Sequence, residues 1–109
     1  MQIKEAQQTI DKLFKNISHP KLASFIALTE EVGELANEIM QKEIYEETSD
    51  NEKIKSELTD VLVWALEIAN LYDINLETEF NKKIQSLEPR VKQWQSSSKL
   101  LKAKRTKLD

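Results

Sequence analysis

Four carboxylates at two repeated spacings are the residues of this chain best suited to chemistry. The segment 28–39 reads LTEEVGELANEI and places Glu31 and Glu34 three residues apart. A second segment, SELTDVL, places Glu57 and Asp60 at the same spacing. On a helix, residues three apart lie on one face, with Cβ atoms about 5–6 Å apart. Like charges at this distance destabilise an isolated helix by roughly 0.2–0.5 kcal/mol per pair, so the two repeats call for a physical reason.

A divalent cation would supply that reason. Four carboxylates that converge beside a hydrophobic core repel one another and lose hydration. Mg²⁺ reverses the sign of this interaction, because it takes oxygen ligands and keeps several waters that substrate phosphates can replace. The residues therefore suit a Mg²⁺-dependent reaction at phosphorus, with Mn²⁺ as a substitute. The alternative is that both pairs are solvated surface glutamates and aspartates, which are common on helices, and the residues alone leave it open.

A di-iron centre is a different metal site that four helices can build. It requires Glu-x-x-His motifs on two of the helices. The only histidine is His19, which falls in the predicted loop NISHP. This requirement excludes the di-iron site, and we expect His19 to be a solvated loop residue.

The composition indicates one folded domain. The chain has 109 residues, of which 39% are hydrophobic and 32% charged, too apolar for a disordered chain. The net charge of −3 gives no basic field to attract nucleic acid. No apolar run approaches the roughly 20 residues of a membrane span. The absence of cysteine fits a cytoplasmic protein.

Apolar residues recur every three or four positions along almost the whole chain, which predicts amphipathic helices. A single glycine and two prolines leave few turns, so we expect long helices with short connections. Pro89 should kink or interrupt the last helix. The result is an all-α, four-helix bundle-like domain over residues 1–98 and a basic tail over residues 99–109 that we expect to be flexible. The predicted helices cover about residues 2–17, 20–43, 51–72 and 76–97.

The elements that must position the carboxylates are the second and third helices. If they pack antiparallel across their acidic connector, the two carboxylate pairs face each other. Gly33 lies inside the second helix, where glycine costs up to about 1 kcal/mol relative to alanine, and close packing of another helix or of a bound group against this turn would explain it. The apolar face of the third helix is too wide for one small bundle to cover, so we expect a homo-oligomer.

The combined pattern resembles a known family. The chain reads E-E-V-G-E-L at residues 30–35 and E-L-T-D-V-L at residues 57–62. The E-E-x-x-E … E-x-x-D order on consecutive helices is similar to that of the MazG-like, all-α nucleoside triphosphate pyrophosphohydrolases. The resemblance extends over about residues 22–83.

This resemblance implies cleavage of a nucleoside triphosphate between its α and β phosphorus atoms, which gives a monophosphate and pyrophosphate. It further implies that Glu30 is the general base for the attacking water. The Mg²⁺ ligands implied by the family pattern are Glu31, Glu34, Glu57 and Asp60.

Candidate substrate contacts lie farther along the chain. The segment FNKKI resembles the family's N-x-K element and suggests Asn81 and Lys83 as phosphate or ribose contacts, although Lys83 can equally be a solvated lysine. Only Arg90 stands near the position of the family's arginine pair. Trp64, one turn after Asp60, could stack on a base or belong to the core or a subunit interface.

We therefore expect a cytoplasmic, Mg²⁺-dependent nucleotide pyrophosphohydrolase with a house-cleaning or pool-control role, assembled as a homodimer or homotetramer. The preferred base and sugar do not follow from the sequence. The alternative is a non-enzymatic helical regulatory or assembly module with a degenerate metal site, in which the basic tail contacts an acidic partner or nucleic acid.

Overall fold

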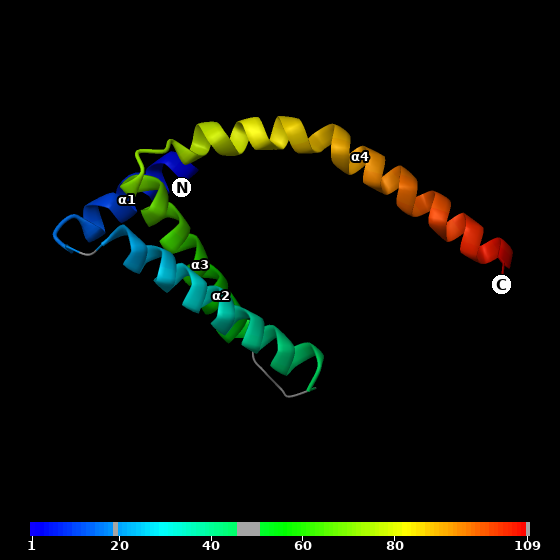
Figure 1. Ribbon diagram of the computed structural model, residues 1–109, viewed down its shortest axis with the longest axis horizontal. Coiled ribbons are helices and arrows are strands. Elements are labelled where there is room, and N and C mark those ends of the chain that lie inside the picture. The colour runs from blue at the N-terminus through cyan, green and yellow to red at the C-terminus, as the bar shows by residue number, and fades with distance from the viewer. Residues whose placement is uncertain (19, 46–50, 109) are drawn as a thin grey trace. The chain divides into compact units, whose positions relative to one another are not determined.

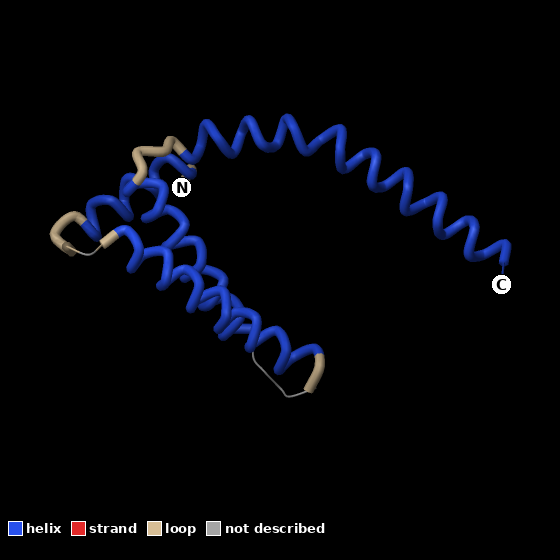
Figure 2. The backbone as a smooth tube through the Cα atoms, viewed as in Figure 1, coloured by secondary structure: helices blue, strands red, loops and turns tan. Residues whose placement is uncertain are grey.

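A computed structural model describes the backbone of residues 1–18, 20–45 and 51–108 and the side chains of these ranges up to Ser96. This part of the chain contains helices and no strand (Figures 1 and 2), which confirms the all-α prediction. His19 lies outside the described residues. The helices are α1 (Ile3–Phe14), α2 (Lys21–Glu43), α3 (Asn51–Leu71) and α4 (Leu76–Leu108).

The helix boundaries differ from the prediction mainly at α1 and α4. Helix α1 ends at Phe14 instead of near residue 17. Helix α4 is 33 residues long and continues through Pro89 to Leu108 instead of ending near residue 97. Pro89 therefore does not interrupt this helix, and a kink at Pro89, the other outcome expected there, stays a prediction. A proline removes one backbone donor, but the hydrogen bonds of the turns before and after it can hold the helix together.

The chain divides into two compact units, Met1–Leu76 and Glu77–Asp109. In the first unit α3 contacts both α1 and α2, as its wide apolar face suggests. Helices α2 and α3 run antiparallel along each other (Figures 1 and 2). The apolar core contains Ile10 of α1 with Leu66 and Ala69 of α3.

The turn between α3 and α4 is fastened to α1 by one side chain. The Gln7 side-chain amide donates a hydrogen bond to the Ile74 carbonyl and accepts one from the Leu76 N–H at 3.1 Å. The Asn70 side-chain amide donates a hydrogen bond to the backbone carbonyl of Gln7 at 3.0 Å. Asp73 adopts a positive φ of 54° in this turn, a conformation that Asp tolerates better than most residues. Gln7 therefore links segments almost seventy residues apart.

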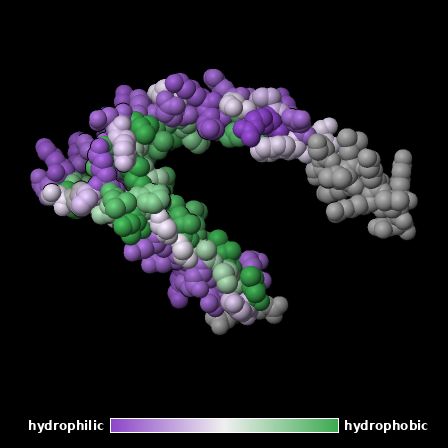
Figure 3. Space-filling model, in the orientation of Figure 1, coloured by the Kyte–Doolittle hydropathy of each residue, from purple (hydrophilic) through white to green (hydrophobic). Residues whose placement is uncertain are grey.

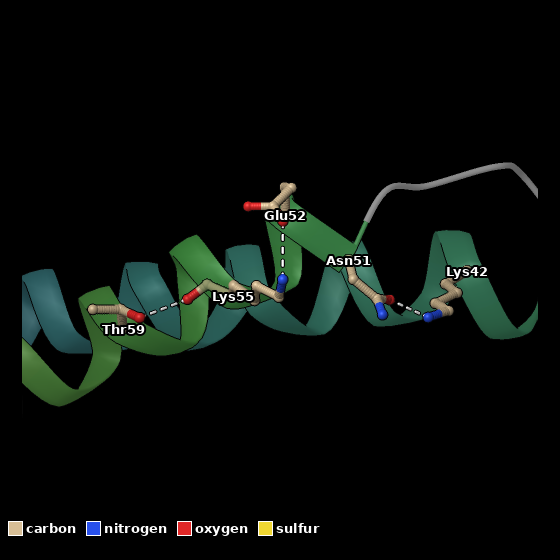
Figure 4. A network of polar contacts seen from close by, with 5 residues as sticks. All are labelled: Lys42, Asn51, Glu52, Lys55 and Thr59. Carbon is tan, nitrogen blue, oxygen red and sulfur yellow. Dashed lines mark hydrogen bonds and ion pairs between the residues drawn. The ribbon is translucent and has the colours of Figure 1, made fainter.

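At the opposite end of the pair, polar contacts join α2 to α3 (Figure 4). The Lys42 ammonium donates to the side-chain oxygen of Asn51, the first residue of α3. Within α3, Lys55 forms an ion pair with Glu52 at 2.9 Å. The Thr59 hydroxyl donates to the Lys55 carbonyl at 2.7 Å. These contacts are exposed, so each contributes little to stability.

The structure gives Gly33 no packing partner. A Cβ atom built on this residue meets no other described atom within 4 Å. The expectation that a neighbouring helix packs closely against this turn is therefore wrong for the described part of the chain. Open space on this side of α2 leaves room for an alanine.

Hydrophobic side chains remain exposed along α2 and α3. Figure 3 shows hydrophobic atoms gathered along one side of this pair. Apolar surface of this extent on a small domain indicates an interaction surface. None of the described helices is long and apolar enough to span a bilayer. The exposed apolar residues of the pair include Leu22, Phe25, Ile26, Val32, Leu58 and Leu62.

Candidate metal centre

Helices α2 and α3 bring three carboxylates together. Glu31 of α2 and Glu57 and Asp60 of α3 each offer one oxygen, and these oxygens lie within 4.8 Å of one another. All three residues are half-buried. The antiparallel packing of the two helices, together with the three-residue spacing on α3, produces this convergence. The spacing of the ligand atoms suits a single divalent cation bound between the helices.

Two of these carboxylates carry an oxygen with no hydrogen-bond donor. One side-chain oxygen of Glu31 and one of Glu57 are buried and accept no hydrogen bond from the described residues. A buried acceptor without a partner is unfavourable, and more so when it is charged. A bound cation would satisfy both oxygens at once, because hard divalent ions prefer carboxylate ligands. The residues present therefore fit a Mg²⁺ or Mn²⁺ ion.

Hydrogen bonds between the carboxyl groups, loss of solvent and, to a lesser extent, charge repulsion raise the pKa of Glu57, and loss of solvent is the main cause of the raised pKa of Glu31. A hydrogen bond to Glu34, loss of solvent and a hydrogen bond to Glu31 raise the pKa of Glu57 to about 7. The pKa of Glu31 is also raised, mainly by loss of solvent and by the charges of Glu34 and Asp60. A proton shared at this site reduces the repulsion, and a divalent cation can replace it.

Glu34 and Glu30 occupy different places around this cluster. Glu34 is exposed and lies close enough to hydrogen-bond with Glu57, but the group of three converging oxygens does not include it. Glu30 is exposed and directly precedes Glu31 on α2. It is not a member of the group either. Three of the four implied metal ligands thus converge, with the fourth beside them.

Trp64 lies one turn beyond Asp60 on α3 and stacks on Phe14, at the end of α1. The two ring centroids are 5.5 Å apart and the ring planes differ by 15°. Offset stacking of this kind stabilises a fold by about 0.5–1.5 kcal/mol beyond the apolar area that it buries. Trp64 is half-buried, and the contact with Phe14 gives it a structural role in the first unit.

The remaining predicted contacts, Asn81 and Lys83, belong to the second unit. Both are exposed on the first turns of α4. Arg90 lies farther along the same helix, with its guanidinium 5.5 Å from the ring centroid of Trp94. This cation–π contact lies within α4, because Trp94 is one helical turn beyond Arg90.

The structure adds a residue that the sequence analysis did not single out. Glu67 of α3 is only 4% exposed, and Ser24 of α2 is fully buried. Glu57, Asp60, Trp64 and Glu67 follow one another at spacings of three and four, so they share one side of α3. The sequence does mark this position, because Glu67 interrupts the longest apolar run of the chain. Glutamate is almost never fully buried unless it is paired.

The fold and the cluster describe an all-α protein whose central helix pair carries three converging carboxylates that could hold a metal ion. A family model for the MazG nucleotide pyrophosphohydrolase domain matches residues 19–94. Because this match covers well over half of the chain, the protein belongs to the MazG nucleotide pyrophosphohydrolase family. No curated protein and no solved structure matches the chain. The resemblance carried by the E-E-x-x-E … E-x-x-D pattern is thereby confirmed.

Proposed function

We propose that this protein is a Mg²⁺-dependent nucleotide pyrophosphohydrolase that converts a (deoxy)nucleoside triphosphate to the monophosphate and pyrophosphate. Membership of the MazG family supports nucleotide pyrophosphohydrolase activity in general. The observation that carries the proposal is the convergence of Glu31, Glu57 and Asp60, with two buried carboxylate oxygens that lack donors.

In the proposed site, Glu31, Glu57 and Asp60 would hold Mg²⁺, and Glu34 would complete the set from the next turn of α2. A bound Mg²⁺ would supply positive charge to the phosphate oxygens of the substrate. Two of the three converging carboxylates lie on α3, the helix that also forms the apolar core, so their backbone positions are fixed before the substrate arrives. Such preorganisation favours the transition state.

Glu30 is the candidate general base. It accepts a proton from the water that attacks the α phosphorus, while the bond from the α phosphorus to the bridging oxygen breaks and pyrophosphate leaves. Glu30 is exposed and directly precedes Glu31, so its carboxylate is accessible to water. A carboxylate in this role typically contributes a factor of about 10²–10⁴ to the rate.

Substrate contacts are proposed for three further residues. Lys83 supplies positive charge to the triphosphate and Asn81 hydrogen-bonds the phosphate or ribose. Trp64 contributes to the base site with the part of its ring that Phe14 does not cover. The exposed apolar side of α2 and α3 supports a homodimer or homotetramer, since association would remove this surface from water.

In the cell, we propose a cytoplasmic enzyme that removes unwanted nucleotides or controls their pool. The decisive experiment incubates the full chain with canonical and modified NTPs and dNTPs, with Mg²⁺, Mn²⁺ or EDTA. Released pyrophosphate and the nucleotide product are measured together. We expect equal amounts of monophosphate and pyrophosphate with at least one substrate, and no reaction in EDTA. A diphosphate and inorganic phosphate as products, or no product from any nucleotide by the folded protein, would contradict the proposal.

Glu57→Gln tests the site itself. Glutamine keeps the size of the side chain but removes the charge that a cation requires, so we expect turnover to fall by at least about 10²-fold with helicity unchanged. Glu52→Gln is the matched control, because Glu52 is an exposed acid on the same helix, paired with Lys55. Equal activity of the Glu57→Gln variant and the wild type would exclude Glu57 as a ligand.

A further inference from the structure

Helix α4 carries an apolar stripe that is independent of the carboxylate cluster. Phe80, Ile84, Val91 and Trp94 are 49%, 46%, 38% and 54% exposed, respectively. Leu87, between them, is half-buried. In Figure 3, hydrophobic atoms gather on one side of this helix and hydrophilic atoms cover the other. Large apolar side chains in a continuous row indicate a surface that packs against another apolar surface.

The spacing of this stripe is that of a coiled coil. Its members are separated by four, three, four and three residues, which is the alternation of a seven-residue repeat. Phe80, Leu87 and Trp94 take the d positions, and Ile84 and Val91 the a positions. Pro89 falls at an f position, on the outer side of the helix, where it interrupts no apolar contact. The next d position along the sequence is again apolar, Leu101.

Side chains of the stripe line a groove that could accept a side chain of a partner helix. An apolar groove on α4 is lined by Ile84, Leu87, Glu88 and Val91, with Lys92 and Gln95 at its margin. Those first four occupy consecutive a, d, e and a positions. In a coiled coil, four residues of one helix form a hole that takes one apolar side chain of the facing helix. A hole of this composition accepts a d residue of a parallel partner, which here is a leucine.

Charge selects the orientation of that partner. Lys83 stands at a g position and Glu88 at the e position five residues later. In a parallel pair, a g residue of one helix lies beside the following e residue of the other, so Lys83 meets the partner's Glu88, twice by symmetry. An antiparallel pair instead places the g positions of the two helices beside each other. Lys83 would then lie near a cation of the second helix, either its Arg90 or its Lys83. The parallel arrangement is therefore favoured.

We propose that residues 80–94 of α4 form a parallel two-stranded coiled coil with the same segment of a second copy of this chain. The partner helix is α4 of the second copy. In a parallel pair, Leu87 of one copy fits the hole on the other copy, and Lys83 of one copy lies beside Glu88 of the other. This inference does not rest on the proposed enzymatic activity. It gives Lys83 a role in pairing that competes with the substrate contact proposed above.

The absence of cysteine allows a clean cross-linking test. Leu87→Cys and Trp94→Cys each place one thiol at a d position, and Ser96→Cys, at an exposed f position, is the control. Under mild oxidation of the full-length protein, we expect disulfide-linked dimers from both d variants and not from the control. Only a parallel, in-register pair can bring residue 87 to residue 87 and residue 94 to residue 94 in one assembly.

Two results would overturn the coiled coil. Cross-linking of the Leu87→Cys variant without the Trp94→Cys variant would indicate an antiparallel crossing. Cross-linking of neither, with circular dichroism showing both variants helical, would mean that the stripe packs on another surface, such as the exposed apolar side of α2 and α3. Equal cross-linking of the Ser96→Cys control would show random collision only.

Charge reversal supplies a second measurement that does not depend on the apolar residues. In the Leu87→Cys background, Glu88→Lys places lysines opposite one another, and we expect disulfide formation to slow by several-fold to about tenfold, as for loss of two exposed ion pairs. Adding Lys83→Glu to this variant should restore the rate. Lys82→Glu, at an f position, should leave it unchanged. A rate that ignores Glu88→Lys, or that the second change fails to restore, would refute the parallel register.

Discussion

The two ends of α3 perform different tasks within one helix. Near its start, Glu57 and Asp60 face Glu31 of α2, and two of the carboxylate oxygens there lack donors. Near its end, Leu66 and Ala69 are buried against α1 and α2, and the following turn is held by Gln7. The second end stabilises the fold, whereas the first end places carboxylates where they repel one another, a cost that the proposed cation would remove. A rigid helix allows the core at one end to hold the acids at the other.

This division explains why so many acids are tolerated beside an apolar stripe. Strain concentrated at a functional site must be offset by packing elsewhere. The buried residues of α3 lie one to three turns beyond Asp60, close enough to fix the helix and far enough to leave the acids accessible. We therefore expect the carboxylate end and the apolar end of α3 to respond differently to substitution, pH and metal.

Leu66→Ala should give the largest change in stability. Truncation of a buried leucine removes apolar contacts and leaves a cavity, so we expect the free energy of unfolding to fall by about 2–5 kcal/mol. Leu62→Ala is the control, because Leu62 is 55% exposed on the same helix, and it should cost less than about 1 kcal/mol. Urea unfolding followed by circular dichroism measures both. Equal losses would mean that assembly buries Leu62 as deeply as the core.

Gln7→Ala should give the next largest change. Loss of two hydrogen bonds to the backbone of the α3–α4 turn should lower the free energy of unfolding by about 1–2 kcal/mol. Gln7→Glu keeps the acceptor for the Leu76 N–H and loses the donor to the Ile74 carbonyl, so it should fall between alanine and the wild type. Gln8→Ala, at the exposed neighbouring position, should have little effect. If Gln8→Ala destabilised the protein as much, the effect would reflect helix α1 as a whole.

The carboxylate end should make stability depend on pH in the absence of metal. Glu57 has a folded pKa of about 7 against a usual value of 4.5, so the folded state binds more protons than the unfolded state between these pH values. The stability contribution of the protonated group is complete below about pH 4.5 and is lost as the pH rises to about 7. We expect the melting temperature in EDTA to fall across this window.

Metal should reverse this behaviour, because a divalent cation binds the ionised form. Excess Mg²⁺ or Mn²⁺ should raise the melting temperature most at pH 7–8 and flatten the pH profile. Glu57→Gln should flatten the profile in EDTA and lose the response to metal. A melting temperature that rises with pH in EDTA would contradict the raised pKa of Glu57.

Gly33→Ala should give the smallest change, and it should be stabilising. The added methyl group meets open space, and alanine is favoured over glycine in a helix by up to about 1 kcal/mol. Ala36→Gly, one turn later on an exposed position, should have the opposite sign. If Gly33→Ala instead weakens metal binding or association, a ligand or a second subunit approaches the backbone at this turn.

Much of the fold could be predicted from local pattern. Apolar residues at intervals of three and four gave four helices whose central two, at 21–43 and 51–71, begin and end within one residue of expectation. The errors fell at the ends of α1 and α4, where amphipathic spacing fades and a proline intervenes. Local spacing predicts where a helix forms, but its end is decided by capping and by contacts with other segments.

The candidate site could be predicted in part. The sequence by itself determined which acids share a helix face and that the chain carries the E-E-x-x-E … E-x-x-D pattern, because both follow from helical periodicity. Only the tertiary structure decided that Glu31 converges with Glu57 and Asp60, that Phe14 covers Trp64, and that no described atom crowds Gly33. These facts depend on the register between antiparallel helices, which is set by packing between residues distant in the chain, and a periodic pattern does not encode that register.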